Sequence, residues 1–184
     1  MDDLPHWDDE ELRPTPVAYP DATSRDETAG AHLRAIHDMY RRGLTEVGVV
    51  VDRVVAGDAA PGEARAAVHG LGLTEAYQQL GSYCGQICAA VRTHHMIEDV
   101  ALYPQLRAAE QALHDTLDRL THEHEVIHEV LERLDAALVA VALDPARLPL
   151  LATTYGHLWR LLESHFAYEE EAIGTALGVH RIGV

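Results

Sequence analysis

The segment LHDTLDRLTHEHEVIHEVLERLDAALVAV (residues 113–141) decides the fold, because its apolar residues recur at steps of three and four positions. This spacing is typical of one face of an α-helix. The apolar positions are Leu113, Leu117, Leu120, Ile127, Val130, Leu134 and Leu138. Two histidines, His124 and His128, lie four residues apart beside this stripe and therefore share its face. The segment predicts a long helix that directs imidazoles toward a protein core.

Three other segments have the same helical period: residues 29–57, 74–103 and 145–177. Pro104 is expected to kink or end the second of them. Asp144 and Pro145 supply an N-cap and a proline at the start of the last. The glycines and prolines of residues 57–73 predict a connection. With no segment typical of a β-strand, the sequence predicts an all-α, up-down-up-down four-helix bundle over residues 29–184.

Residues 1–28 form a separate, acidic region that contains four of the eight prolines of the chain. Because proline is not tolerated in a helix interior, this region is predicted to be an extended N-terminal arm. Trp7 and Tyr19 are the side chains expected to attach the arm to the surface of the bundle.

Composition excludes several classes of protein. The 184 residues include 14 Lys plus Arg against 30 Asp plus Glu, a net charge of −16 that would repel nucleic acid. No apolar run approaches the ~20 residues that span a bilayer. The first residues are acidic, unlike a signal peptide. We therefore expect a soluble, cytoplasmic protein with no nucleic-acid or membrane partner.

The 13 histidines are unusually many for this length, and several lie at metal-ligand spacing. One predicted helix carries His37, and the other three each carry a pair four residues apart. An apolar interior penalises unpartnered polar groups by several kcal/mol, whereas a metal ion accepts both imidazole nitrogen and carboxylate oxygen. The candidate metal ligands are His37, His94, Glu98, His124, His128, His165 and Glu169.

One of these pairs has a competitor, because His95 and Asp99 repeat the spacing of His94 and Glu98 one residue later. Glu98 continues the apolar face of the preceding turns, which favours the His94–Glu98 pair. His95 and Asp99 are then expected to flank the site, and the shifted pair remains the alternative.

Four motifs carry a resemblance to a known family: IHD at His37, HHMIEDVALYPQL from His94, LTHEHEVIHEVLERL from Leu120 and ESHFAYEE from Glu163. Together they resemble the hemerythrin-like, or HHE cation-binding, domain over residues 30–177. The last motif is similar to mycobacterial and other actinobacterial hemerythrin-like proteins, for which handling of nitric oxide or peroxide is implied. The acidic arm has no counterpart in the family pattern.

The resemblance implies two iron ions joined by an oxo or hydroxo bridge. One iron would be held by His124, His128 and His165, and the other by His37 and His94, with Glu98 and a carboxylate of the last helix between them. Family spacing selects Glu170 for that carboxylate, but helical geometry favours Glu169, since Glu170 is rotated about 140° from His165. Another group, such as Tyr40, is the alternative to His128.

The implied function is binding, sensing or detoxifying O2, peroxide or nitric oxide, so the expected partner is a small diatomic or peroxide ligand. Peroxidase-like turnover stays open, and so does storage of iron or zinc without redox chemistry. The segment HEVIH (residues 124–128) also matches the HExxH motif of zinc hydrolases, but those enzymes need a strand for their substrate. Cys84 and Cys88 are predicted to be small core residues.

Overall fold

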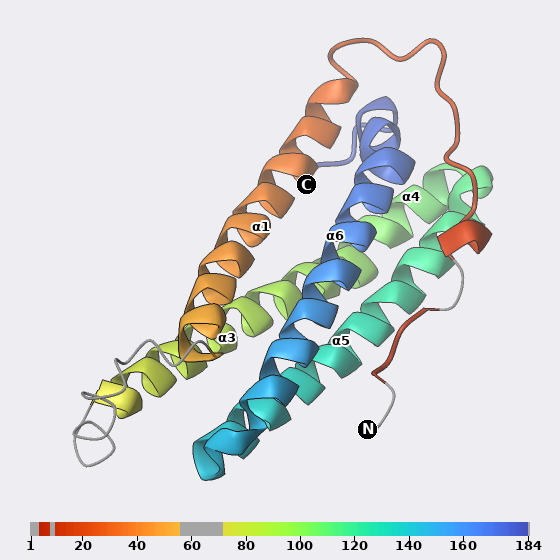
Figure 1. Cartoon of the computed structure of the whole chain (residues 1–184). Helices are drawn as coiled ribbons and strands as arrows, with labels where there is room; N and C mark the ends of the chain where they lie inside the picture. Colours follow the sequence, from red (N-terminus) through yellow and green to blue (C-terminus); the bar gives the residue numbers. More distant parts are fainter. Residues whose placement is uncertain (1–3, 8–9, 56–71, 184) are drawn as a thin grey trace.

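The helices begin and end near the positions that the apolar period predicts. The computed structural model describes residues 4–7, 10–55 and 72–183 (Figure 1). Its elements are η1 (Glu10–Leu12), α1 (Glu27–Val55), α3 (Gly72–Ile97), η2 (Glu98–Leu102), α4 (Tyr103–Ala109), η3 (Gln111–Leu113), α5 (His114–Leu143), η4 (Pro145–Arg147) and α6 (Leu148–Val179). No strand occurs within the described ranges, and the all-α prediction is confirmed. Most of the predicted connection after α1 lies outside the described residues.

The four long rods of the bundle are α1, the continuous segment α3–η2–α4, α5 and α6, and each packs against two others. Helix α1 packs against α3 and α6, and α5 packs against the other side of both α3 and α6. Consecutive long helices run in opposite directions, as Figure 1 shows. The predicted up-down-up-down bundle is therefore the observed architecture.

Local signals explain two of the helix boundaries. The backbone N–H of Ala146 donates to Oδ1 of Asp144 at 3.0 Å, so Asp144 caps the turn that leads into α6 as predicted. Pro104 lies in the first turn of α4, directly after η2. The element η2 is a single π-helical turn, and it continues the rod from α3 into α4. Pro104 thus marks a change of helix type within the rod.

Helices α1 and α6 approach closely at two glycines. A Cβ atom added to Gly30 would lie 2.9 Å from the backbone carbonyl carbon and oxygen of Gly174. Side chains at this crossing would push the two helices apart. Since α1 and α6 both carry candidate ligands, the two glycines help to set the width of the site.

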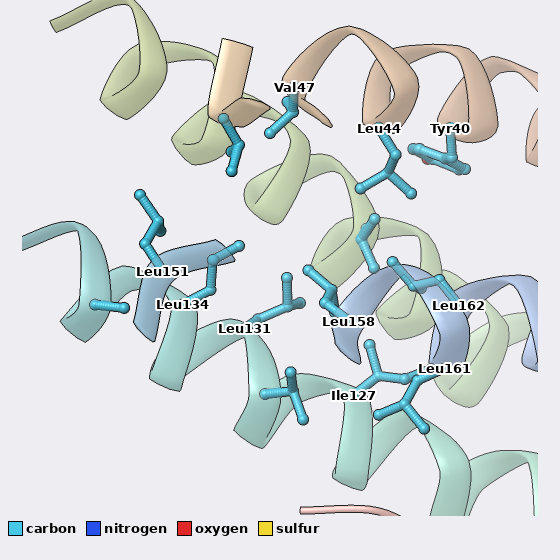
Figure 2. Packing of buried hydrophobic residues seen from close by; sticks show 14 of the residues in the cluster. Tyr40, Leu44, Val47, Ile127, Leu131, Leu134, Leu151, Leu158, Leu161 and Leu162 are labelled. Carbon is cyan, nitrogen blue, oxygen red and sulfur yellow. The ribbon is translucent and has the colours of Figure 1, made fainter. Parts of the chain in front are cut away.

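Buried apolar side chains form two clusters, one toward each end of the bundle. The Leu131 cluster includes Leu44, Val91, Leu131 and Leu158, and Figure 2 shows side chains of α1 facing those of α5 and α6 within it. The Leu117 cluster includes Leu33, Leu102, Leu106, Leu117 and Ile173.

A polar layer separates the two clusters on all four rods. On α1, for example, Leu33 belongs to one cluster and Leu44 to the other, and the buried His37 lies between them. On the other three rods, residues of the two clusters likewise lie on either side of buried polar residues, which are His94 to Glu98, His124, and His165 to Glu169. These buried residues are therefore at a common depth inside the bundle.

The described part of the N-terminal arm lies against the bundle. Trp7 is 5% exposed and belongs to the Leu131 cluster, which is deeper than the surface contact that the sequence suggested. The hydroxyl of Tyr19 donates to Oε2 of Glu110 at 2.5 Å.

Two smaller expectations concern membranes and cysteines. No helix among residues 10–55 and 72–183 combines the length and apolar character needed to cross a membrane. Cys88 is half-buried against the Leu131 cluster, and the side chain of Cys84 lies outside the described residues.

Candidate metal centre

Seven buried side chains form two adjacent groups in the polar layer. The three-histidine cluster consists of His95, His124 and His165, and the mixed cluster consists of His37, His94, Glu98 and Glu169. Within each cluster, one possible ligand atom per residue lies within 4.8 Å of all the others. None of the seven residues is more than 7% exposed.

Imidazole nitrogens face one another inside each cluster. In the mixed cluster, Nε2 of His37 lies 3.0 Å from Nε2 of His94. In the three-histidine cluster, Nε2 of His124 lies 3.1 Å from Nε2 of His165. Each pair of nitrogens is close enough to share one cation, and histidine binds metals through its neutral imidazole.

Two carboxylates lie between the clusters. Glu98 places Oε1 3.1 Å from Nε2 of His94 and Oε2 3.6 Å from Nε2 of His124. Glu169 places Oε2 3.2 Å from Nε2 of His37 and 4.0 Å from Nε2 of His165. Each carboxylate therefore reaches a histidine of both clusters, which is the placement that a bridge between two metal ions requires.

Several polar atoms at this point are buried without a hydrogen-bond partner. Within the described part of the chain they are Nε2 of His95, both carboxylate oxygens of Glu98 and Oε2 of Glu169. Leaving such groups buried and unpaired costs roughly 1–3 kcal/mol each. Bound cations would provide the missing partners, so the donor set fits a pair of metal ions.

Three of the ligand histidines use their other nitrogen to bind a carboxylate. Nδ1 donates to Glu170 at 2.9 Å in His37, to Asp99 at 3.0 Å in His124 and to Glu123 at 3.1 Å in His165. A carboxylate at Nδ1 fixes the tautomer that leaves the Nε2 lone pair free, and it raises the basicity of that nitrogen. The rings are therefore oriented for metal binding before any ion arrives.

Glu169 and Glu170 of α6 lie on opposite sides of His37 relative to the mixed cluster. Glu169 is fully buried in the mixed cluster, as helical geometry favoured. Glu170 lies behind His37, where it also accepts a hydrogen bond from Arg41 at 2.8 Å.

His128, which the sequence predicts as a ligand, belongs to neither cluster. His128 is half-buried, and its Nε2 lies 3.2 Å from Nδ1 of His95. His95, which the sequence suggested as a flanking group, occupies the third position of the three-histidine cluster.

Both members of the His94–His95 dipeptide contribute because α3 lies between two neighbours. His94 meets His37 of α1, and His95 stacks on His124 of α5 with ring centroids 3.9 Å apart. Spacing along one helix makes the two residues alternatives, whereas two neighbouring helices give each its own cluster. Asp99 stays outside the clusters and binds His124, and the Tyr40 hydroxyl is directed to the carbonyl of Ala90 at 3.4 Å.

Tyr103 is a buried polar residue that the sequence analysis used only as a helix end. Its hydroxyl donates to Oε1 of Glu169 at 2.6 Å and lies 3.4 Å from Nε2 of His124. Tyr103 follows Glu98 by five residues, which share a face in a π-helical turn but not in an α-helix. Burial and the nearby Glu169 and Glu98 raise the pKa of Tyr103 far above its usual value, so it remains a proton donor.

The charges of the metal-free site already favour a cation. Burial lowers the pKa of His94 to about 3, so this imidazole stays neutral. Burial opposes the charges of both His37 and Glu169, but the two groups contact each other. Their contact, with Glu170 beside His37, raises the pKa of His37 and lowers that of Glu169. The carboxylates thus stabilise a positive charge on His37, and a metal ion bound at this place would benefit from the same carboxylates.

A cavity of about 360 Å³ leads from the surface to the mixed cluster. It is lined by residues of α1, of α3, η2 and α4, and by Gly183, and His94 and Glu98 of the mixed cluster are among them. Its other lining residues include Ile36, Met39, Tyr40, Ile97, Ala101 and Leu102. The walls are mainly apolar, so the cavity suits a small uncharged molecule.

The comparison with protein families agrees with this geometry. Residues 28–177 match the model described as the hemerythrin HHE cation binding domain, which covers all four rods and begins after the N-terminal arm. Searches of curated proteins and of solved structures gave no significant match. Because the family model spans most of the sequence and the buried ligand clusters lie within it, the chain belongs to the hemerythrin HHE cation-binding family.

Proposed function

We propose that the two clusters hold a pair of iron ions, through which the protein binds, senses or detoxifies O2, peroxide or nitric oxide. The observation that carries this proposal is the position of Glu98 and Glu169, whose carboxylates each reach a histidine of both clusters. The unpartnered oxygens of both residues support it.

The donor set favours iron that changes oxidation state. Five neutral imidazoles and two carboxylates place less negative charge on the metals than a carboxylate-rich site does, so the ferrous state is more accessible. A bound iron pair supplies electron transfer to O2, peroxide or nitric oxide, which protein side chains alone do not provide.

Side chains of the protein control the surroundings of the pair. Tyr103 fixes Glu169 through Oε1 and leaves Oε2 directed toward His37 and His165. The Tyr103 hydroxyl also lies close to the three-histidine cluster, 3.4 Å from Nε2 of His124. It is therefore placed to orient Glu169 and to keep a proton beside that carboxylate.

The cavity supports a small uncharged ligand and indicates where it binds. It ends at the mixed cluster, which offers two imidazoles where the other cluster offers three. The metal with fewer protein ligands has more positions free for an incoming molecule. Apolar walls admit O2, nitric oxide or hydrogen peroxide more readily than hydrated ions.

The zinc-hydrolase alternative is not supported by the geometry of the HEVIH segment. His128 lies outside both clusters, and the Glu125 side chain is 74% exposed, so the motif does not form a site around one ion. A hydrolytic zinc site requires both histidines on the metal.

The test compares iron-loaded wild type with His94→Ala after reduction and exposure to each ligand. Steady consumption of hydrogen peroxide or nitric oxide that His94→Ala abolishes would indicate detoxification. Reversible O2 uptake without consumption would indicate a binder or sensor. Tightly held metal that reacts with none of the three would contradict the proposal and favour a storage protein.

A further inference from the structure

The N-terminal arm reaches the metal centre through one side chain. Along the described arm, Pro5 accepts a hydrogen bond from His157 at 2.7 Å, and Pro14 accepts one from Tyr168 at 3.0 Å. Between them, the Arg13 guanidinium stacks on the ring of Tyr168, 4.7 Å from its centroid. The arm precedes residue 28, where the family match begins. It is thus a feature of this chain beyond the matched domain.

Arg13 makes three hydrogen bonds to the bundle. Its Nε and Nη2 donate to Oε1 and Oε2 of Glu123 at 2.8 and 2.9 Å, and Nη1 donates to Oγ of Ser164 at 2.9 Å. The Arg13 side chain is 12% exposed and that of Glu123 is fully buried. Two parallel hydrogen bonds from one guanidinium fix a carboxylate in orientation as well as position.

Glu123 transmits this constraint to a candidate ligand. Its Oε2, which Arg13 holds, also accepts the hydrogen bond from Nδ1 of His165. Arg119 donates only to Oε1, at 2.7 Å, so it does not hold the oxygen that faces His165. Burial raises the pKa of Glu123, but hydrogen bonds from His165, Arg13 and Arg119 outweigh it and bring the value to about 2.

We infer that Arg13 is a positioning residue for the metal centre: it holds Oε2 of Glu123 so that His165 keeps its proton on Nδ1 and presents Nε2 to the three-histidine cluster. The arm then acts on metal retention as well as on stability. This inference rests on the proposed function only in assigning a metal to that cluster, because the orientation of His165 exists without an ion.

The first test needs no metal. Ring-nitrogen NMR of the metal-free full chain should show His165 as a single tautomer with the proton on Nδ1. Arg13→Gln should produce a mixture of tautomers at His165. Arg13→Lys keeps the positive charge but not the two parallel hydrogen bonds, so it should give a smaller fraction of the second tautomer than Arg13→Gln. Tyr19→Phe is the matched control, since it removes the arm's hydrogen bond to Glu110, distant from Glu123, and should leave His165 unchanged.

The second test measures release of iron to a chelator from the loaded proteins. Partners of a ligand histidine typically change metal affinity 10–100-fold, so Arg13→Gln should release one ion about tenfold faster than wild type or Tyr19→Phe. An unchanged His165 tautomer in Arg13→Gln or Arg13→Lys would overturn the inference, as would equal changes in Tyr19→Phe. Failure of wild type to bind iron would instead overturn the proposed function, and the NMR result would still stand.

Discussion

At the scale of single residues, the second nitrogen of each histidine explains why the site is organised before metal binds. His37, His124 and His165 each donate Nδ1 to a buried or half-buried carboxylate and turn Nε2 inward. These carboxylates contribute by holding the rings, whereas Glu98 and Glu169 lie among the Nε2 atoms. The two groups of carboxylates should therefore respond differently to mutation.

The first prediction separates His95 from His128. His95→Ala should lose one of two bound irons, because His95 completes the three-histidine cluster. His128→Ala should retain both, since His128 only contacts His95 from outside. Metal analysis of the purified variants checks this, and loss of iron from His128→Ala alone would contradict the placement.

The second prediction separates Glu98 from Asp99. Glu98→Ala removes one of the two carboxylates that reach both clusters and should abolish binding of at least one iron. Asp99→Ala removes only the partner of His124 and should weaken affinity about 10–100-fold. Titration with ferrous iron measures both variants, and equal losses would point to the shifted His95–Asp99 pair instead.

Sequence spacing anticipated most of these residues but could not resolve neighbours. Pairs four residues apart identify a helix face, and this located His94 with Glu98 and His165 with Glu169. The same rule selects His128, which lies in neither cluster, because spacing along one helix does not specify the neighbouring helices. It also forced a choice between His94 and His95, although a rod with neighbours on both sides can direct each to a different cluster.

At the scale of elements, the π-helical turn η2 lies directly beside the site. It widens the rod at Glu98–Leu102 and brings Tyr103 toward the face that carries Glu98. An apolar period of 3.6 residues does not reveal such a turn, so Tyr103 was not identified from the sequence. Pro104 was the one local signal in the sequence. It predicted that the helix is kinked or ends there, but not that a π-helical turn precedes it.

The third prediction concerns the crossing of α1 and α6. Gly30→Ala would place a methyl group 2.9 Å from the backbone of Gly174, and overpacking of this kind typically costs about 1–3 kcal/mol. Gly85→Ala on α3 is the control, because its Cβ meets nothing within 4 Å. Urea unfolding should show Gly30→Ala destabilised and Gly85→Ala unchanged or more stable; equal stabilities would contradict the close approach.

At the scale of the whole molecule, the four-helix architecture was predictable because the apolar period is uninterrupted over long segments. The arrangement of the arm was not, since single aromatic and basic residues in an extended segment do not specify their partners. Trp7 enters the Leu131 cluster and Arg13 pairs with Glu123, 110 positions away. Such contacts depend on the assembled bundle.

The polar layer makes the metal-free molecule sensitive to acid. Burial lowers the pKa values of His94, His95, His128 and His165, so the folded state resists protonation there. The unfolded chain takes up these protons below about pH 6.5. Two groups act in the opposite direction, because burial raises the pKa of Glu98, and Glu169 and Glu170 raise that of His37. These two groups oppose four imidazoles.

The fourth prediction follows from this balance. A group whose pKa is lowered in the folded state stabilises the protein above its unfolded pKa, and this stability is lost as the pH falls. Each excess proton on the unfolded chain contributes about 1.4 kcal/mol per pH unit. The free energy of unfolding of the metal-free protein, measured with urea, should therefore decrease from pH 7 to pH 5. An increase over this range would contradict the assigned pKa directions.

The central claim is that two metal ions lie side by side between two apolar clusters. Metal analysis of the full chain together with its near-ultraviolet and visible spectrum tests this claim most directly. The fifth prediction is two irons per chain, with the absorption of a bridged ferric pair. One iron or fewer per chain, or iron without that absorption, would contradict the account.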